Sequence, residues 1–156
     1  MDKLVQLSEY LDVPVNYFFD DLDITSVNMA SIPVYGGISC GNGRINYDEP
    51  TDYEEIPMDW LNGGEYFMMY ADGDSMSGSR IYNGDRLLIK KQPCVENGEL
   101  GVVVVEDSTA LKKINLQGDL LMLESTNINY PTRVYDLSKD RNVRIIGKLE
   151  KLIIDF

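Results

Sequence analysis

The hydrophobic residues of the first 22 positions follow a helical period, whereas those after position 31 follow the two-residue period of β-strands. Leu4, Leu7 and Leu11 recur at the three-to-four spacing of one helix face. The segment that follows is acidic and polar with little pattern, which is typical of a linker. We therefore predict three parts: a short N-terminal helix within residues 1–22, a linker at 23–31 and a folded domain at 32–156.

Short apolar runs separated by turn sequences predict strands throughout the folded domain. The predicted strands are Ile32–Tyr35, Tyr66–Ala71, Arg86–Lys90, Leu100–Glu106, Thr109–Leu116, Leu120–Glu124 and Val143–Ile154. Turn signals such as Asn83-Gly84-Asp85 and Gly41-Asn42-Gly43 lie between them. Val102–Val105 is a continuous β-branched run, as expected for a strand buried on both faces. This pattern predicts a mainly β fold, a sandwich or partly closed barrel of short strands.

Composition limits the chemistry that the domain can perform. The 156 residues carry a net charge of −12, which argues against this polypeptide binding a phosphate backbone by itself. No segment has the roughly 18–20 apolar residues of a membrane span, and no signal peptide is visible, so we expect a cytoplasmic protein. Its two cysteines, Cys40 and Cys94, should then be reduced. Two thiols without histidine make a poor zinc site, and we expect neither a metal nor a cofactor.

The absence of histidine also restricts nucleophilic catalysis. It excludes Ser-His-Asp and Cys-His arrangements, so a serine nucleophile must use a carboxylate, a terminal amine or a lysine as base. Ser75 lies in the turn Gly73-Asp74-Ser75-Met76, which exposes its hydroxyl beside backbone N–H groups that can stabilise an oxyanion. Most serines in such turns only hydrogen bond to backbone, so Ser75 alone is not specific.

Lys112 is the candidate base. Two-residue alternation places Lys112 on the same, more apolar face as Ile114 and Leu116. Lys113 falls on the other face, where we expect more solvent. Burial lowers the pKa of a lysine and favours the neutral amine that a base requires. The alternative is a solvent-facing strand lysine whose stem covers the sheet, and residue type alone favours that alternative.

An ordered set of motifs extends over residues 32–150. Its members are Gly73-Asp74-Ser75-Met76, Asn83-Gly84-Asp85, Asn97-Gly98-Glu99-Leu100, Ala110-Leu111-Lys112-Lys113-Ile114, Leu123-x-Ser125-x-Asn127-x-x-Tyr130-Pro131 and Val143-Arg144-Ile145-Ile146-Gly147-Lys148. This set resembles the LexA/phage-repressor family of self-cleaving serine peptidases. The resemblance implies the β-domain of that family, with Ser75 as nucleophile and Lys112 as general base.

The resemblance also implies that the chain carries its own substrate, since the family cleaves an Ala-Gly or Cys-Gly bond upstream of the serine. Cys40-Gly41 lies at the matching place. A glycine there lets the backbone approach the nucleophile closely. The alternative is a loop with a buried free thiol. The chain departs from the family at Ser77-Gly78-Ser79, which is small where a proline or bulky residue often follows the serine.

The implied function is that of a repressor's C-terminal domain, which dimerises the repressor and inactivates it by self-cleavage during DNA damage. The implied partners are a second copy in a homodimer, an activated RecA filament as trigger, and operator DNA only through a missing N-terminal domain. Residues 1–22 resemble the last helix of a helix-turn-helix head, a remnant that should not bind operator DNA by itself. One alternative is a non-cleaving dimerisation or antirepressor-binding module of a prophage repressor. Another is a signal-peptidase relative, which the lack of a membrane anchor disfavours.

Overall fold

The computed structural model describes residues 28–41 and 44–154. The chain divides into two compact units, one comprising residues 1–30 and 55–62 and the other residues 31–54 and 63–156. Every residue of the candidate site belongs to the second, larger unit. The helix predicted within residues 1–22 lies outside the described residues and stays a prediction.

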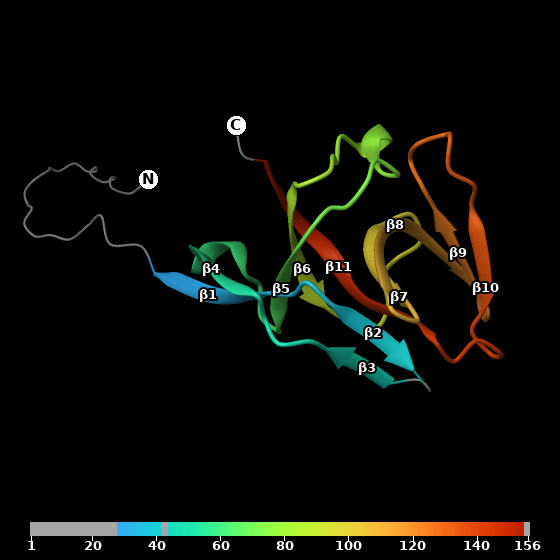
Figure 1. Cartoon of the computed structure of the whole chain (residues 1–156), viewed down its shortest axis with the longest axis horizontal. Helices are drawn as coiled ribbons and strands as arrows, with labels where there is room; N and C mark the ends of the chain where they lie inside the picture. The colour runs from blue at the N-terminus through green and yellow to red at the C-terminus, as the bar shows by residue number, and fades with distance from the viewer. Residues whose placement is uncertain (1–27, 42–43, 155–156) are drawn as a thin grey trace, which may run out of the picture. The chain divides into compact units, whose positions relative to one another are not determined.

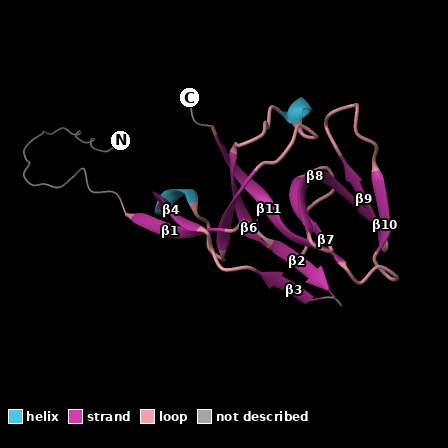
Figure 2. Cartoon of the chain, viewed as in Figure 1, coloured by secondary structure: helices cyan, strands magenta, loops and turns pink. Residues whose placement is uncertain are grey.

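The described part of the fold consists mainly of strands, as predicted (Figures 1 and 2). The strands are β1 Met29–Val34, β2 Ile38–Gly41, β3 Arg44–Tyr47, β4 Asp52–Pro57, β5 Tyr66–Tyr70, β6 Arg86–Lys91, β7 Leu100–Val105, β8 Ser108–Gln117, β9 Leu120–Glu124, β10 Arg133–Asp136 and β11 Val143–Ile153. Two short 3-10 helices accompany them, η2 Met58–Trp60 and η3 Ser77–Ser79. The β2, β3, β4 and β10 strands were not among those predicted from the sequence.

In the smaller unit, the described residues form the start of β1, the end of β4 and η2. The Met58 N–H donates a hydrogen bond to the Asn28 carbonyl at 2.9 Å, and the Leu61 N–H closes the 3-10 turn on the Met58 carbonyl at 3.0 Å. These backbone hydrogen bonds define the unit's local structure.

Nine strands form one mixed sheet in the order β10-β9-β8-β7-β11-β6-β5-β1-β4. The sheet has β10 and β4 at its two ends and is not closed into a barrel. The pairing of β1 with β5 is parallel, whereas β5 through β11 pair antiparallel with their neighbours.

The β7 strand is the central buried strand that the valine run predicted. Val102 and Val104 belong to one apolar cluster, and Val103 belongs to another, so both faces of β7 are covered. All three side chains have no exposed surface. This packing makes β7 a rigid support for β8, its antiparallel neighbour, where the candidate base lies.

A separate hairpin of β2 and β3 carries the predicted cleavage site. Figure 1 shows this hairpin beside β7, and β2 contacts both β7 and β8. Ile38 and Cys40 of β2 are buried and join the apolar cluster that contains Leu111 of β8. The hairpin is therefore packed onto the core rather than projecting from it.

Candidate active site

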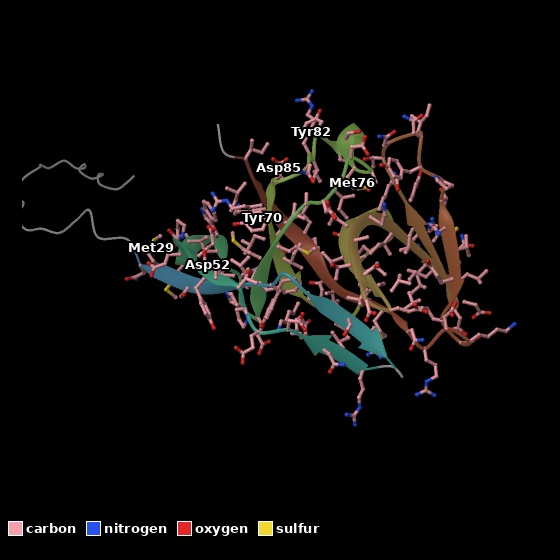
Figure 3. The ribbon with its side chains drawn as sticks, viewed as in Figure 1. Met29, Asp52, Tyr70, Met76, Tyr82 and Asp85 are labelled. Atoms are coloured by element: carbon pink, nitrogen blue, oxygen red, sulfur yellow. The ribbon has the colours of Figure 1, made fainter. Side chains whose placement is uncertain are left out.

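Ser75 lies in the loop of residues 71–85 that connects β5 to β6. Backbone hydrogen bonds close the base of this loop, because the Ala71 N–H donates to the Asp85 carbonyl at 2.8 Å. Met76, the next residue, is buried and packs into the core. In the view of Figure 3, Met76 lies on the β8 side of the loop, whereas Tyr82 lies on the opposite side. The loop is thus anchored next to the position of the candidate nucleophile.

Lys112 reaches Ser75 from the adjoining part of the sheet. Lys112 is in β8, opposite Gly101 of β7. The Lys112 Nζ lies 2.8 Å from the Ser75 Oγ and also 2.8 Å from the Ser125 Oγ. The structure therefore brings together the two residues proposed from the sequence as nucleophile and base, and it adds a second hydroxyl on the same amine.

The surroundings of Lys112 favour the neutral amine. Partial burial lowers the pKa of Lys112 below its ordinary value, and the positive charge of Arg133 lowers it further. The Tyr130 ring also faces this amine, because its centroid lies 5.8 Å from the Nζ at a cation–π distance. Lys113 is also only partly exposed. The strand alternation predicted that Lys113 would be more exposed than Lys112, but the two lysines do not differ in this way. Lys112 is distinguished instead by its hydrogen bonds to Ser75 and Ser125.

The loop after β9 holds the turn Gly73-Asp74-Ser75-Met76 through backbone and side-chain hydrogen bonds. We call this turn the nucleophile turn. The Asn127 N–H donates to the Ser75 carbonyl and the Asn127 Nδ2 to the Asp74 carbonyl, each at 3.0 Å. The Tyr130 hydroxyl donates to the Asp74 carboxylate. This hydrogen bond and the charge of Asp74 raise the pKa of Tyr130, so the phenol stays protonated. We call residues 125–130 the clamp loop.

The small residues after Ser75 have a packing reason. A Cβ built on Gly78 would lie 1.9 Å from the Thr126 carbonyl oxygen, which is backbone of the clamp loop. Real Cβ atoms essentially never approach another heavy atom that closely. Any side chain at position 78 would therefore push the clamp loop away from the nucleophile turn. This accounts for the glycine at the place where the sequence departs from the family.

A cavity of about 260 Å³ opens beside Ser75. Ser75 lines it together with the apolar side chains Met69, Ile81, Leu87 and Leu111 and the polar side chains Asp72 and Thr109.

Cys40 and Gly41 are not brought to this cavity. The Cys40 N–H donates to the Glu106 carbonyl at 2.7 Å, at the turn between β7 and β8, and its thiol lies 3.7 Å from the Arg141 carbonyl. Ile38, two positions before Cys40 in β2, lines the cavity, whereas Cys40 and Gly41 do not. Cys40 is a buried free thiol whose pKa is raised by burial, and Gly41 is exposed.

The roles of Ser125, Asn127 and Tyr130 were not assigned from the sequence. All three occur in the motif Leu123-x-Ser125-x-Asn127-x-x-Tyr130-Pro131. Their spacing was therefore visible in the sequence, whereas their contacts with Lys112 and with the turn around Ser75 were not. Within the described part of the chain, no group of three or more His, Cys, Asp or Glu side chains could hold a metal ion. No helix among the described residues is long and apolar enough to span a membrane.

Comparison with known proteins places this site in a family context. A family profile described as Peptidase S24-like matches residues 33–150. The LexA repressor of Gluconobacter oxydans is 32% identical over 123 residues, which are 78% of this chain and 50% of that protein. The LexA repressor of Pelagibacter ubique is 32% identical over 137 residues, 87% of this chain and 60% of that protein. The LexA repressor of Thermosipho africanus is 34% identical over 124 residues, which are 79% of this chain and 61% of that protein. The chain thus spans about half to three fifths of the length of these curated relatives.

Proposed function

Because this chain belongs to the Peptidase S24-like family, we propose that it is the part of a transcriptional repressor that cuts its own Cys40–Gly41 bond with Ser75 and Lys112. The observation that carries this proposal is the 2.8 Å separation of the Lys112 Nζ and the Ser75 Oγ in a chain without histidine. The lowered pKa of Lys112 supports its role as the base.

The chemistry follows from the two side chains. Neutral Lys112 takes the proton of the Ser75 hydroxyl as the Oγ attacks the Cys40 carbonyl carbon. The tetrahedral intermediate breaks its bond to the Gly41 nitrogen, which receives the proton from the Lys112 ammonium. An ester between Ser75 and Cys40 remains. Lys112 then takes a proton from water as the water attacks this ester, and it returns that proton to the Ser75 Oγ. The products end in a Cys40 carboxylate and begin with a Gly41 amine.

Cleavage requires the β2–β3 hairpin to move. The Cys40 N–H donates to the Glu106 carbonyl at the turn between β7 and β8, so the scissile bond must leave this position before it reaches Ser75. Gly37 and Asp48 border the hairpin, and the Asp48 N–H donates to the Gly37 carbonyl at 3.0 Å. The observed rate is then the chemical rate multiplied by the docked fraction. A partner that binds the docked state, such as a RecA filament, would accelerate cleavage.

Scission would inactivate the longer repressor by separating its parts. The relatives are longer than this chain, and in the proposal the remaining length supplies the DNA-binding head. A dimer that contacts two half-sites gains affinity from the connection, and cutting the chain before Gly41 removes that gain. We propose β11 as part of the dimer contact, because Ile154 just beyond it is 42% exposed and Leu152 is partly exposed.

A second candidate function is a dimerisation or antirepressor-binding module that does not cut itself. The position of Cys40 and Gly41 away from Ser75 favours this candidate. The pairing of Ser75 with Lys112 favours self-cleavage, because a module without catalysis has no chemical need for a partly buried lysine on a serine.

A time course of intact mass separates the two candidates. The purified chain is incubated from about pH 7 to pH 10, together with the Ser75→Ala variant. Self-cleavage predicts loss of the full-length mass, faster at higher pH, in the unaltered chain only. A full-length mass that persists at every pH, with circular dichroism showing a folded chain, supports the non-cleaving module instead.

A further inference from the structure

The Lys112 amine has two hydroxyl neighbours at the same distance, and the mechanism uses only one of them. The Ser125 Oγ lies 2.8 Å from the Nζ, as the Ser75 Oγ does. We propose that Ser125 is a positioning residue that orients the Lys112 amine toward Ser75. This inference rests on the proposed self-cleavage and assigns a role within that same site.

The two serines differ in their access to substrate. Ser75 lines the cavity beside the nucleophile turn, whereas Ser125 is not among the residues that line it. Ser125 instead follows directly after β9, at the start of the clamp loop. A peptide in the cavity would therefore meet the Ser75 hydroxyl, and Ser125 can act only through Lys112.

The hydrogen-bonding capacity of a neutral amine explains why a second hydroxyl matters. A neutral lysine amine has two N–H donors and one lone pair, and the lone pair must point at the Ser75 hydroxyl to accept its proton. If one N–H donates to the Ser125 Oγ, the rotation of the amine about its terminal bond is restricted. Without this acceptor, the lone pair points at Ser75 for a smaller part of the time, and the rate of proton transfer falls.

The same acceptor stabilises the ammonium form. Removal of the Ser125 Oγ should therefore lower the pKa of Lys112 further, in the direction in which burial and Arg133 already shift it. The other groups that face the amine are the Tyr130 ring and, hydrogen bonded to the Tyr130 hydroxyl, the Asp74 carboxylate. Since the hydrogen bond to Asp74 raises the pKa of Tyr130, the phenol stays protonated in the range where the lysine should titrate.

The test compares Ser125→Ala with Ser125→Thr and with a matched serine control, Ser31→Ala, which is on exposed surface of β1. Self-cleavage is followed by mass from about pH 7 to pH 10. We expect Ser125→Ala to lower the maximal rate about 10- to 100-fold, by analogy with other misplaced catalytic groups. The rise of rate with pH should also move to lower pH. Ser125→Thr, which keeps a hydroxyl, should restore both properties, and Ser31→Ala should change neither.

A second measurement is independent of turnover. In a Ser75→Ala background, which prevents scission, the Lys112 side chain is titrated by carbon-detected NMR with and without Ser125→Ala. The expected result is a lower midpoint without the Ser125 hydroxyl. If Ser125→Ala does not fold, Ser125→Cys, with its weaker acceptor, replaces it in both measurements.

The outcomes separate this inference from the proposed function. If the unaltered chain does not cleave, or Ser75→Ala cleaves equally fast, the proposed function is wrong. If the unaltered chain cleaves and Ser125→Ala shows the same maximal rate and pH profile, only the role of Ser125 is wrong. A lower maximal rate with an unmoved pH profile and an unmoved lysine midpoint would show a merely structural role and would overturn the inference.

Discussion

The nucleophile turn and the cleavage hairpin differ in how closely the structure approaches a reactive arrangement. At the turn, Ser75 and Lys112 already lie within hydrogen-bonding distance, and the clamp loop fixes the turn through Asn127. At the hairpin, Cys40 is equally well fixed, but to Glu106 and Arg141 rather than to the cavity beside Ser75. One region already pairs the proposed nucleophile with the proposed base, whereas the proposed scissile bond lies elsewhere.

This difference indicates which part of the molecule should control the rate of the proposed self-cleavage. In the proposed self-cleavage, Ser75 and Lys112 need no rearrangement, so the slow step should be the release and docking of the hairpin. Substitutions at the turn should then change the chemistry itself, whereas substitutions at the hairpin should change the docked fraction. The two classes should differ in sign as well as in size, because loosening the hairpin accelerates the reaction and loosening the turn slows it.

The largest effect is expected at the base. Lys112→Ala should reduce self-cleavage by about 10²- to 10⁴-fold, the range that general bases contribute, while the chain stays folded. Lys113→Ala is the matched control, because Lys113 is an adjacent, partly exposed lysine in the same strand. Intact-mass time courses compare the two. Equal rates in the two variants would mean that the wrong lysine has been assigned.

A side chain at position 78 should separate the turn from the clamp loop. Gly78→Val places atoms against the Thr126 carbonyl, so the loop must move, and we expect about a 100-fold slower cleavage. Ser79→Ala, at the neighbouring position, serves as control. The rates are measured alongside the thermal midpoint. A Gly78→Val chain that cleaves as fast as the control would show that the clamp loop does not position Ser75.

The pH dependence should report the base. Only the neutral amine accepts a proton, so the rate should rise about tenfold per pH unit below the pKa of Lys112 and then level off. Because that pKa is lowered, the plateau should begin below the ordinary lysine value. In the interval between the folded and ordinary values, the unfolded chain binds more protons at this position, so the contribution of Lys112 to stability should rise with pH. Rates and denaturant midpoints across this range test both signs, and a rate that falls from neutral to alkaline pH would contradict the assignment.

The smallest effect, and the one of opposite sign, is expected at the hairpin. The Lys91 Nζ lies 4.3 Å from the centroid of the Tyr47 ring in β3, and this ring also packs against Tyr35. Lys91→Ala should destabilise the observed position of the β2–β3 hairpin relative to the docked one. Cleavage should then accelerate about two- to fivefold, which corresponds to a cation–π contact of about 0.5–1 kcal/mol.

Lys91 also pairs with Glu65 at 3.3 Å, so Glu65→Gln is the control that removes the ion pair and leaves the ring contact. Slower cleavage in Lys91→Ala would mean that this contact supports the docked position of the hairpin rather than the observed one.

The sequence predicted most of the sheet, and the two residues that it proposed as nucleophile and base lie within hydrogen-bonding distance of each other. Buried strands such as β7 have continuous β-branched runs, and these were recognised correctly. The β3 strand was missed because its alternation covers only four residues, and β4 because Ile56 is its one buried residue among acidic neighbours. The β2 strand was missed because a four-residue strand with one cysteine and one glycine gave no signal of its own.

The site could be predicted only as far as motif spacing extends. Ser75 and Lys112 were proposed together because their motifs occur in a family-like order, and their contact is a tertiary property that the spacing only implied. The role of Ser125 depends on where the clamp loop folds back, which no local pattern reports. In the proposed mechanism, the position of Cys40 depends on the difference in free energy between the observed and the docked placement of the hairpin. Residue types alone do not report such a difference.

The most direct test of the account is the identity and kinetic order of the cleavage. The purified chain is incubated at alkaline pH at two protein concentrations about 100-fold apart, and the products are identified by mass. We predict a fragment that begins at Gly41 and that forms with the same first-order rate at both concentrations, because the hairpin docks in its own chain. Cleavage at any other bond, or a rate that increases in proportion to protein concentration, would contradict the account.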